Sequence, residues 1–548
     1  MEAIQYKDIV LKGEVAARGI KNFARLHDRF YTPGVVGSSE AENVGWPGDW
    51  EGRTILALTL MGQNLKADPA YLEEIITDIL SGLNAGGYRG DLLEHGSINE
   101  QQLAGHGWLL RGLAEVYLWK GDGKIKTAIE RIVNSLYLPL AGRFSSYPAQ
   151  PEDRGGYEGK AAGDLTGETV GGWRISSDTG CAFIALDGLT QVYELFGGPA
   201  LGQLIDEMIN TFLKIDFIGI TMQTHATLTA TRGILRMYTL DRRPELLEAV
   251  RRIFGLYKLE GMTENFANYN WFCKPEWTEP CGIIDAFMLA ASLWQYTGEA
   301  AYLEDAHNIW YNGVCRGQRP NGGFGCDQCV TDGTLRVYSN YYEAYWCCTM
   351  RGGEGLSSIS RFSLYKEEDT LLLPFYLDSI ITLQDGSETV IRETSHYPLE
   401  GAVQLEVLEG NGKNYTLKLY LPPWAQKPEV FQNGRQIPFE EINGFVVFAA
   451  CFNKGDRLNL HFDIPIYASD TIGMLHAGKG LKTVRHGTLV LGAKLEEAPL
   501  NIEPVSLTYK GNGRYEGNGV KLFPLNEAYL LEEKAVRESA YRILFNVF

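Results

Sequence analysis

Between about residues 50 and 365 the apolar positions recur with the period of an α-helix. In the segment from His106 to Asp122, HGWLLRGLAEVYLWKGD, the apolar side chains gather on one face before Gly121. Similar helix endings recur at three later places, residues 193–197, 235–238 and 294–298. Helix pairs repeating every 45–75 residues or so indicate helical hairpins that close into a toroid. We therefore predict an α/α toroid over residues 16–365.

Near residue 370 the apolar period changes to two. Residues 402–407 (AVQLEV) and 415–420 (YTLKLY) alternate apolar with polar side chains, and Asn-Gly pairs punctuate the segment. This pattern predicts an antiparallel β-sandwich over residues 366–470. A second strand-rich block, residues 471–548, either forms its own domain or completes the first sandwich. Residues 1–15 contain a strand that we expect to join a sandwich.

Length and charge narrow the class of protein. A chain of 548 residues exceeds the roughly 250–300 residues at which single cores stop growing, so two or more domains are expected. The formal net charge of −18 argues against a nucleic-acid partner, since such binding relies on clustered Lys and Arg. A neutral substrate, such as a sugar, fits this surface better.

The sequence predicts a cytoplasmic protein with no membrane partner. Its first eight residues, MEAIQYKD, contain no basic stretch leading into an apolar one, and no run of about 18 uncharged apolar residues occurs. Nine cysteines are an odd number, and in a reducing compartment they indicate thiols or metal ligands rather than disulfides. The oligomeric state stays open, with a homodimer as one alternative.

Reactive side chains are densest between residues 264 and 348. This stretch holds Glu279 two residues before Cys281, the Cys326–Cys329 pair and the adjacent Cys347 and Cys348. Zinc takes four ligands from thiolate, imidazole and carboxylate. Composition alone favours core packing for vicinal cysteines, because buried free thiols are common. A carboxylate just before a cysteine at the head of an apolar helix shifts the balance toward a metal site.

These motifs resemble glycoside hydrolase family 127, the bacterial β-L-arabinofuranosidases. Glu279 and Cys281, which open the apolar helix 282–294, are similar to the family's Glu-Thr-Cys motif, and Cys347-Cys348 is similar to its Cys-Cys pair. In that family the four residues bind zinc, so the resemblance implies a Zn²⁺ cofactor held by Glu279, Cys281, Cys347 and Cys348.

The resemblance extends along most of the chain in short matches, and it implies that the helical toroid over residues 16–365 is an (α/α)6 barrel and the catalytic domain. Glu264, within Thr-Glu-Asn-Phe, stands fifteen residues before Glu279, where the family has its acid/base glutamate. Residues 393–401 (ETSHYPLEG) are similar to the family's strand entry into the sandwich, as are the Pro-Pro-Trp-Ala at 422–425 and the Asn-Gly at 433–434.

Carried over residue by residue, the family mechanism makes Cys347 both a zinc ligand and the nucleophile. Its thiolate attacks the anomeric carbon while Glu264 protonates the leaving oxygen, and water then hydrolyses the glycosyl-cysteine with retention of configuration. The implied activity is that of an exo-acting β-L-arabinofuranosidase on an oligosaccharide or glycoside. A thiol with a pKa of about 8.5 is mostly protonated near neutral pH. A bound metal would lower this pKa and keep the sulfur as a thiolate.

Sugar contacts are implied less closely. His106, within Gly-His-Gly, is similar to a sugar-binding histidine at a helix start. For a second family histidine, the sequence offers Arg232 at the matching spacing and His225 two helical turns earlier on a similar face. The family's Pro-Pro-Asn after the Cys-Cys pair is replaced by Thr349-Met350-Arg351, which leaves the substrate range open.

Three alternatives stay open. The same zinc-thiolate apparatus could act on another pentose or a deoxy sugar. A metal-free barrel hydrolase could pair Glu264 with Asp178 or Asp49 and invert configuration across about 6.5–9.5 Å. A non-catalytic carbohydrate-binding protein could hold a structural zinc on thiolates alone, from Cys326, Cys329, Cys347 and Cys348.

Overall fold

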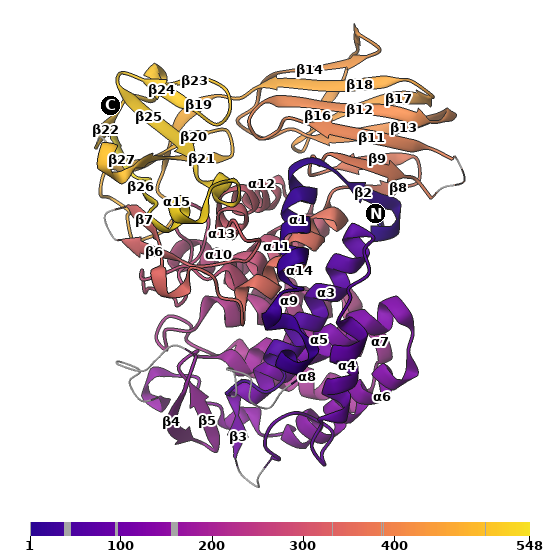
Figure 1. The fold of residues 1–548 in the computed structure, drawn as a ribbon, viewed down its shortest axis with the longest axis vertical. Helices are drawn as coiled ribbons and strands as arrows, with labels where there is room; N and C mark the ends of the chain where they lie inside the picture. The colour runs from indigo at the N-terminus through magenta and orange to yellow at the C-terminus, as the bar shows by residue number, and fades with distance from the viewer. Residues whose placement is uncertain are drawn as a thin grey trace.

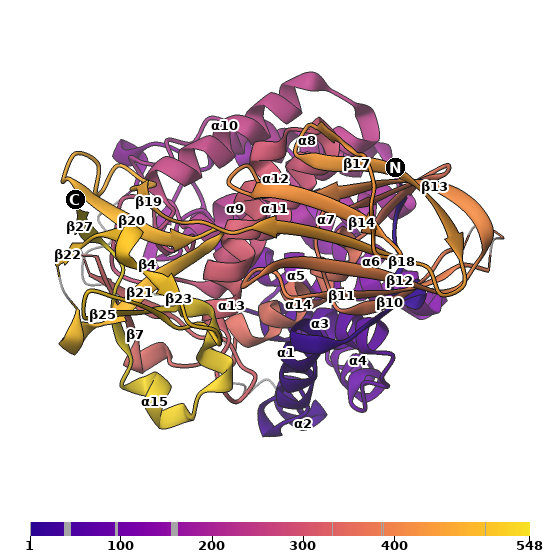
Figure 2. The same ribbon diagram turned by 90° about the horizontal axis from the view of Figure 1, so that it is seen from above.

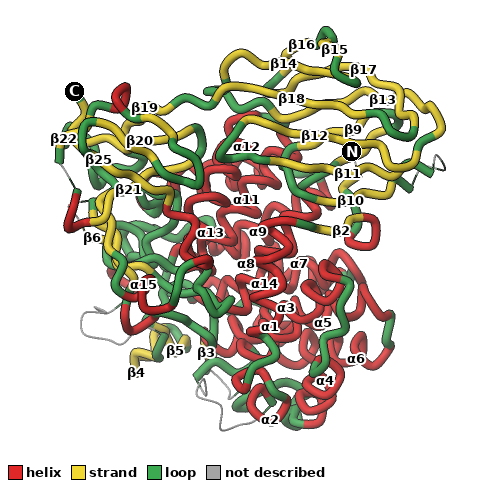
Figure 3. The backbone as a smooth tube through the Cα atoms, turned by 45° about the horizontal axis from the view of Figure 1, so that its top comes forward, coloured by secondary structure: helices red, strands yellow, loops and turns green. Residues whose placement is uncertain are grey.

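The fold is a helical barrel joined to two β-rich regions (Figure 1). The computed structural model describes residues 2–548 except 38–44, 94–96, 155–162, 331–332, 385, 387 and 499. Figure 3 shows the helices gathered in one body and most of the strands above it. In the described part of the chain, no helix is long and apolar enough to cross a bilayer.

Six helices of the described chain form the inner ring of the barrel. Each contacts the next, and the last contacts the first, which closes the ring. In ring order they are α3 (Asp49–Leu65), α5 (Glu100–Lys120), α7 (Ala185–Phe196), α9 (Thr224–Asp241), α11 (Pro280–Thr297) and α14 (Cys348–Phe362). The ring confirms the toroid predicted from the helical period, in the (α/α)6 form that the family resemblance implies.

An outer layer of helices covers this ring. Each outer helix packs on one or two inner ones. They are α1 (Gly13–Arg25), α4 (Leu72–Ser81), α6 (Gly123–Ile132), α8 (Pro199–Phe212), α10 (Pro244–Glu260) and α12 (Ala300–Asn308). Helix amphipathicity explains the layering, because α11 buries nearly its whole length whereas α10 buries one stripe and exposes the rest.

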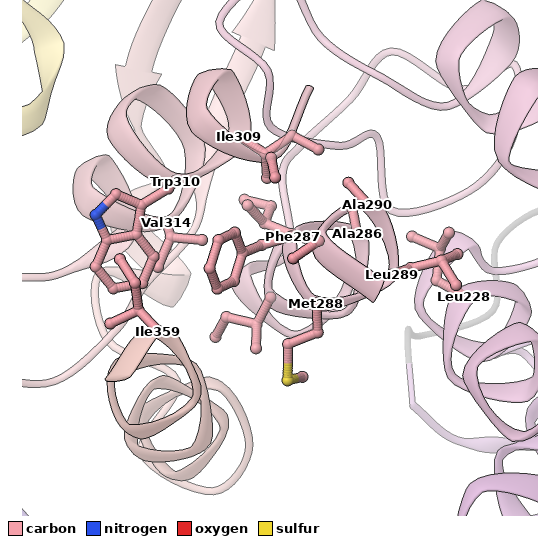
Figure 4. Packing of buried hydrophobic residues seen from close by; sticks show 14 of the residues in the cluster. Leu228, Ala286, Phe287, Met288, Leu289, Ala290, Ile309, Trp310, Val314 and Ile359 are labelled. Carbon is pink, nitrogen blue, oxygen red and sulfur yellow. The ribbon is translucent and has the colours of Figure 1, made fainter. Parts of the chain in front are cut away.

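The core is continuous around α11. Figure 4 shows side chains of α11 between Leu228 of α9, Ile359 of α14 and the helical turn after α12. The Phe287 ring lies 5.0 Å from the Trp310 ring at a tilt of 47°. This packing fixes the axial position of α11, whose first turn carries two of the predicted metal ligands.

Glycines allow the inner helices to approach closely. A Cβ atom on Gly52 of α3 would lie 2.2 Å from the Leu109 backbone nitrogen of α5. A Cβ atom on Gly188 of α7 would lie 2.3 Å from the Gly107 carbonyl oxygen. Real side chains do not reach such distances, so these helices pack backbone against backbone at these points.

Two sheets form the β-sandwich that lies across the helices (Figure 2). One sheet has the order β1 (Glu2–Ala3), β8 (Tyr365–Glu367), β9 (Thr370–Leu373), β13 (Asn411–Tyr420), β17 (Phe445–Asn453) and β16 (Glu440–Ile442). The other has the order β15 (Arg435–Gln436), β14 (Gln426–Gln432), β18 (Arg457–Asp463), β12 (Gly401–Glu409), β11 (Val390–Ser395), β10 (Ser379–Thr382) and β2 (Ile9–Leu11).

The N-terminal strands enter both sheets of this sandwich, since β1 pairs with β8 and β2 pairs with β10. The neighbouring pairs are antiparallel, as the alternating pattern predicts, except that β9 and β13 run parallel. The chain visits the other sheet as β10, β11 and β12 between these two strands. That crossover supplies the long connection that a parallel pair needs.

A third sheet contains the C-terminal strands and a hairpin from the barrel. Its hairpin strands β6 (Asp327–Val330) and β7 (Thr334–Val337) lie between α13 (Cys315–Gly317) and α14, and β7 pairs with β26 (Ala540–Arg542). Its other strands are β19 (Ile466–Asp470), β20 (Leu481–His486), β21 (Leu489–Lys494), β22 (Asn501–Ile502), β23 (Thr508–Tyr509), β24 (Tyr515–Gly517), β25 (Val520–Pro524) and β27 (Phe545–Val547). The C-terminal region is thus a sheet apart from the sandwich, attached to the barrel through β7.

The remaining described elements are short. A small sheet near the loops of the barrel contains β3 (Ile98–Asn99), β4 (Leu165–Val170) and β5 (Trp173–Ser176). Two short helices are α2 (Pro33–Val36) and α15 (Glu533–Arg537).

Close packing between α3 and α5 predicts a specific sensitivity. We expect Gly52→Ala to lower stability by about 1–3 kcal/mol, because the new methyl group forces the two helices apart. Gly255→Ala is the matched control: Gly255 lies exposed on α10 with nothing within 4 Å of the added atom, and we expect a gain of roughly 0.4–1 kcal/mol. Thermal unfolding midpoints measure both changes, and equal midpoints for the two variants would contradict this packing.

Candidate active site and metal centre

Two helix N-termini bring the predicted metal ligands together. Glu279 occupies the N-cap position of α11, and Cys281 lies in the first turn of that helix. Cys347 occupies the N-cap position of α14, and Cys348 is the first residue of that helix. The two helices are neighbours in the ring, so their starts meet. Helix N-termini favour negative groups and lower the pKa of cysteine thiols. The local fold therefore supplies a site for thiolates.

Cys347 and Cys348 occupy different positions at the start of α14. In the structure Cys347 precedes the first turn of α14 and Cys348 lies within it. Cys347 is half-buried and Cys348 is buried.

The four ligand atoms lie within 4.8 Å of one another. Cys281 Sγ is 3.0 Å from Cys347 Sγ and 3.6 Å from Cys348 Sγ. Cys347 Sγ is 3.9 Å from Cys348 Sγ and 3.8 Å from Glu279 Oε1. Tetrahedral zinc with Zn–S bonds of about 2.3 Å separates its sulfur ligands by about 3.8 Å. The donor set and most of its spacings therefore fit such an ion, and this group can hold a metal.

The cluster distributes charge unevenly among its members. Burial, followed by the nearby Cys347 sulfur, raises the pKa of Glu279 well above its usual value. Burial likewise raises the pKa values of the Cys281 and Cys348 thiols. Hydrogen bonds from these two thiols lower the pKa of Cys347 well below its usual value, with help from Arg53. Of the three thiols in the group, Cys347 is the one whose pKa is lowered.

Arg53 of α3 neutralises part of this charge. Its Nη1 donates to Cys281 Sγ at 3.4 Å, and its Nε donates to Asp49 Oδ1 at 2.9 Å. The guanidinium carbon lies 4.5 Å from the centroid of the Trp108 ring, within the range of a cation–π interaction. The His225 ring stacks on the same indole at 5.8 Å and an interplanar angle of 8°.

His225 is held as a neutral imidazole. Burial lowers its pKa, and its Nδ1 lies 2.8 Å from Asp285 Oδ2. Burial alone would raise the pKa of Asp285, but Arg351, His225 and Arg232 hold that pKa well below its usual range. The carboxylate therefore accepts a hydrogen bond from Nδ1–H, and the lone pair of Nε2 points toward Arg53 Nη2 at 3.4 Å.

Two adjoining cavities border Cys347, with volumes of about 140 Å³ and about 260 Å³. They share a lining of Gly163, Asp178, Gln223, Glu279, Trp346 and Cys347. Asn270, Trp277 and Tyr341 add to the smaller cavity, and Asp49, Arg53 and His225 to the larger one.

Three buried polar atoms around the smaller cavity have no hydrogen-bond partner among the described residues. They are Asp178 Oδ1, Asn270 Oδ1 and Trp277 Nε1. Buried polar atoms are nearly always paired, so we expect ordered water or a polar ligand to complete these hydrogen bonds. Trp277 also forms an aromatic wall with Tyr341, whose ring centroid lies 4.5 Å away. Aromatic faces beside hydrogen-bonding groups suit a sugar.

Two aspartates near the Cys347 sulfur have raised pKa values. Burial, followed by the charge on Cys347, raises the pKa of Asp178 to about 7. Burial also raises the pKa of Asp49 to about 6, although Arg53 opposes the shift. The sequence offered both aspartates only as carboxylates of a metal-free alternative, and the structure brings them beside the cysteine cluster.

Family models match the two halves of this architecture. The β-L-arabinofuranosidase GH127 catalytic domain matches residues 187–361, which contain all four candidate ligands. The GH127 middle domain matches residues 370–464, which form most of the sandwich. The chain belongs to glycoside hydrolase family 127. It is accordingly an enzyme, a glycoside hydrolase that acts on a carbohydrate.

Solved structures agree with the fold over the whole chain. A GH127 β-arabinofuranosidase superposes with a TM-score of 0.72 at 13% identity, covering 100% of this chain and 98% of that one. A GH127 β-L-arabinofuranosidase from Geobacillus stearothermophilus T6 gives 0.67 at 14% identity, with 99% and 100% covered. A further glycoside hydrolase gives 0.71 at 13%, with 100% and 98% covered. No curated protein matches the sequence.

Glu264, the predicted acid/base, faces the C-terminal region. Its Oε2 accepts a hydrogen bond from Ile472 N at 2.8 Å, and its Oε1 lies 2.9 Å from His476 Nδ1. Its side chain is 4% exposed and does not line either cavity within the described part of the chain. Its catalytic role stays a prediction, in an arrangement that occupies both carboxylate oxygens.

Of the three predicted sugar contacts, the structure places His225 at the cavities. His106 is fully buried in α5, where Nε2 accepts from Arg89 N at 2.9 Å and Nδ1 lies 2.8 Å from Gln102 O. Burial lowers its pKa to about 4. Arg232 lies deeper along α9 and lines another cavity, and its Nη1 is 2.7 Å from Asp285 Oδ1. Sugar binding by His106 and Arg232 stays a prediction.

The all-thiolate alternative is not the group that the structure assembles. The metal-binding group found among the described residues contains Glu279 and Cys281 in place of Cys326 and Cys329. Cys326 lines the smaller cavity, and Cys329 lies in β6.

Sequence reasoning missed Arg53, Asn270 and Trp277. Arg53 had a signal, since Asp49 stands four residues earlier on a helical stretch and thus one turn away on the same face. Asn270 and Trp277 lie in an irregular segment between α10 and α11, where no periodicity reports side-chain direction.

The geometry predicts that metal binding requires Cys281. We expect purified wild-type protein to contain one zinc per chain. Cys281→Ser should lose most of its zinc after dialysis against a chelator, because the loss of one thiolate costs several kcal/mol, about 10²-fold or more in affinity. Cys273→Ser is the control, because this exposed thiol lies outside the group. Full zinc occupancy in Cys281→Ser, measured by elemental analysis, would refute this ligand set.

Proposed function

We propose that this chain is a retaining exo-glycosidase that releases a terminal β-L-arabinofuranosyl residue through a cysteine nucleophile. One observation carries the proposal: Cys347 belongs to the metal-binding group, lines both cavities, and is the thiol whose pKa is lowered. The sugar comes from the description of the matching family models.

Zinc is the proposed metal, held by Glu279, Cys281, Cys347 and Cys348. Its chemistry when bound is to keep its sulfur ligands deprotonated at neutral pH. A lowered thiol pKa also lowers intrinsic nucleophilicity, so the reaction depends on holding the sugar close to sulfur.

In the first step the Cys347 thiolate attacks the anomeric carbon. The C–S bond forms as the bond to the leaving oxygen breaks, and a carboxylic acid gives that oxygen a proton. In the second step water attacks the same carbon, the C–S bond breaks, and the carboxylate takes a proton from the water. Two inversions give net retention. His225 and Arg53 line the larger cavity, where they can bind sugar hydroxyls.

The size of the cavities supports action on a chain end. At about 140 Å³ and about 260 Å³, both are smaller than the roughly 300–1,000 Å³ typical of drug-sized ligand sites. They suit a terminal residue better than the middle of a polysaccharide.

Arg351 stands where the Pro-Pro-Asn motif of the family has another residue. It is fully buried and forms an ion pair with Asp285, the carboxylate that contacts His225.

We propose a cytoplasmic location for the enzyme. The cysteines of the described chain are free, and the cluster works only with reduced sulfur. Reducing conditions would protect the close Cys281–Cys347 contact, 3.0 Å between sulfurs, from oxidation.

A panel of 4-nitrophenyl glycosides tests the proposed activity. We expect β-L-arabinofuranoside to be hydrolysed at least tenfold faster, in kcat/KM, than α-L-arabinofuranoside, β-D-xyloside and a deoxy-sugar glycoside, because the −1 sugar must present its anomeric carbon to Cys347. NMR of the first product should show retained configuration. A different sugar leading the panel would overturn the arabinose assignment, and inversion would overturn the cysteine nucleophile.

A further inference from the structure

We infer that Asp178 is the acid/base of this enzyme, giving a proton to the departing glycosidic oxygen and later taking one from the attacking water. The inference rests on the proposed function and adds to it the second reacting group. It assigns to Asp178 the part that the resemblance to family 127 implies for Glu264.

Asp178 shares both cavities with the nucleophile. It lines the smaller and the larger cavity, as does Cys347. Its Oδ1 atom is buried and has no partner among the described residues. Because the residue is only half-buried and lines both cavities, its carboxyl group can meet an atom of a bound substrate.

The backbone around Asp178 is fixed from several sides. Its own N–H donates to Ser176 Oγ at 3.1 Å, and its carbonyl accepts from Cys181 N at 3.1 Å, where the chain enters α7. Thr179 O accepts from Gln223 N at 3.1 Å, and Gln223 Nε2 reaches Glu279 Oε2 at 3.4 Å. These contacts tie the loop to the metal-binding group, as general acid catalysis requires of a positioned carboxyl group.

Other carboxyl groups near the cluster are committed elsewhere. Asp49 is paired with Arg53, with 2.9 Å between nitrogen and oxygen. Glu279 is one of the four candidate metal ligands. Both oxygens of Glu264 are engaged by Ile472 and His476. Asp178 forms no ion pair with any cation of the described chain, and its carboxyl group has only neutral hydrogen-bond partners, the Gln223 side chain and the Gly163 backbone.

With Asp178 as the acid/base, every proton is accounted for in both steps. In the first step the Asp178 carboxyl proton passes to the leaving alcohol, while the Cys347 electron pair forms the C–S bond. In the second step one proton of water returns to the Asp178 carboxylate, while the remaining hydroxyl bonds to the anomeric carbon and the sulfur departs as thiolate. Enzyme and thiolate are regenerated.

The test compares Asp178→Asn, Asp178→Ala and Glu264→Gln on two glycosides of the sugar that the wild type hydrolyses fastest. One glycoside has a nitrophenyl leaving group, which needs no proton, and the other has a methyl leaving group, which does. We expect Asp178→Asn to lose about 10²–10⁴-fold in kcat/KM on the methyl glycoside and less than about tenfold on the nitrophenyl one. Glu264→Gln should lose equally on both.

A second readout separates acid/base function from structural damage. With the nitrophenyl glycoside, kcat and KM of Asp178→Ala should fall together, because the glycosyl-cysteine now hydrolyses slowly. Sodium azide, which attacks without a base, should restore kcat and give a glycosyl azide of retained configuration. Zinc content and the unfolding midpoint of each variant show that it is folded and metal-loaded.

Two outcomes would overturn the inference: equal losses on both glycosides for Asp178→Asn with no azide product, or the leaving-group pattern appearing in Glu264→Gln. Failure of the proposed function looks different. It would appear as a Cys347→Ser protein that keeps wild-type turnover, whatever the Asp178 variants do.

Discussion

The contact of three cysteine sulfurs with one carboxylate at two helix ends is the constraint on which the rest of the site depends. Burying four ionisable groups together is costly unless opposite charge accompanies them. The protein supplies part of that charge through Arg53, which donates to Cys281 and stacks on Trp108. Arg351 lies on the same indole, 4.3 Å from its centroid. A divalent metal would supply the rest.

Barrel packing makes that contact reproducible. The starts of α11 and α14 meet because the inner ring closes, and the ring closes because glycines such as Gly52 and Gly188 let neighbouring helices touch through their backbones. The Asp285 carboxylate in α11 then holds His225 of α9 and Arg232 beneath the cavities. Fold and site are thus coupled through the inner face of the barrel. The sandwich lies across the helices and is not part of this coupling.

Sequence reasoning reached the architecture and the metal-binding group, and stopped at side-chain direction. The helical period identified the barrel, and the Glu279–Cys281 and Cys347–Cys348 motifs identified residues that the structure assembles. Spacing from Glu279 could not show that Glu264 turns toward His476, since direction in an irregular segment depends on tertiary contacts. Asp178 lay in no periodic segment and matched no motif. Its proximity to Cys347 arises only when the loop before α7 folds over the ring.

A covalent label identifies the residue that bonds to the sugar. A haloacetamide or epoxide analogue of the sugar, incubated with the zinc-loaded enzyme and located by peptide mass spectrometry, reports which atom attacks the anomeric carbon. We expect one label per chain on Cys347, blocked by substrate and absent from Cys347→Ser. Labelling of Cys348, or of a carboxylate with Cys347 unmodified, would contradict it.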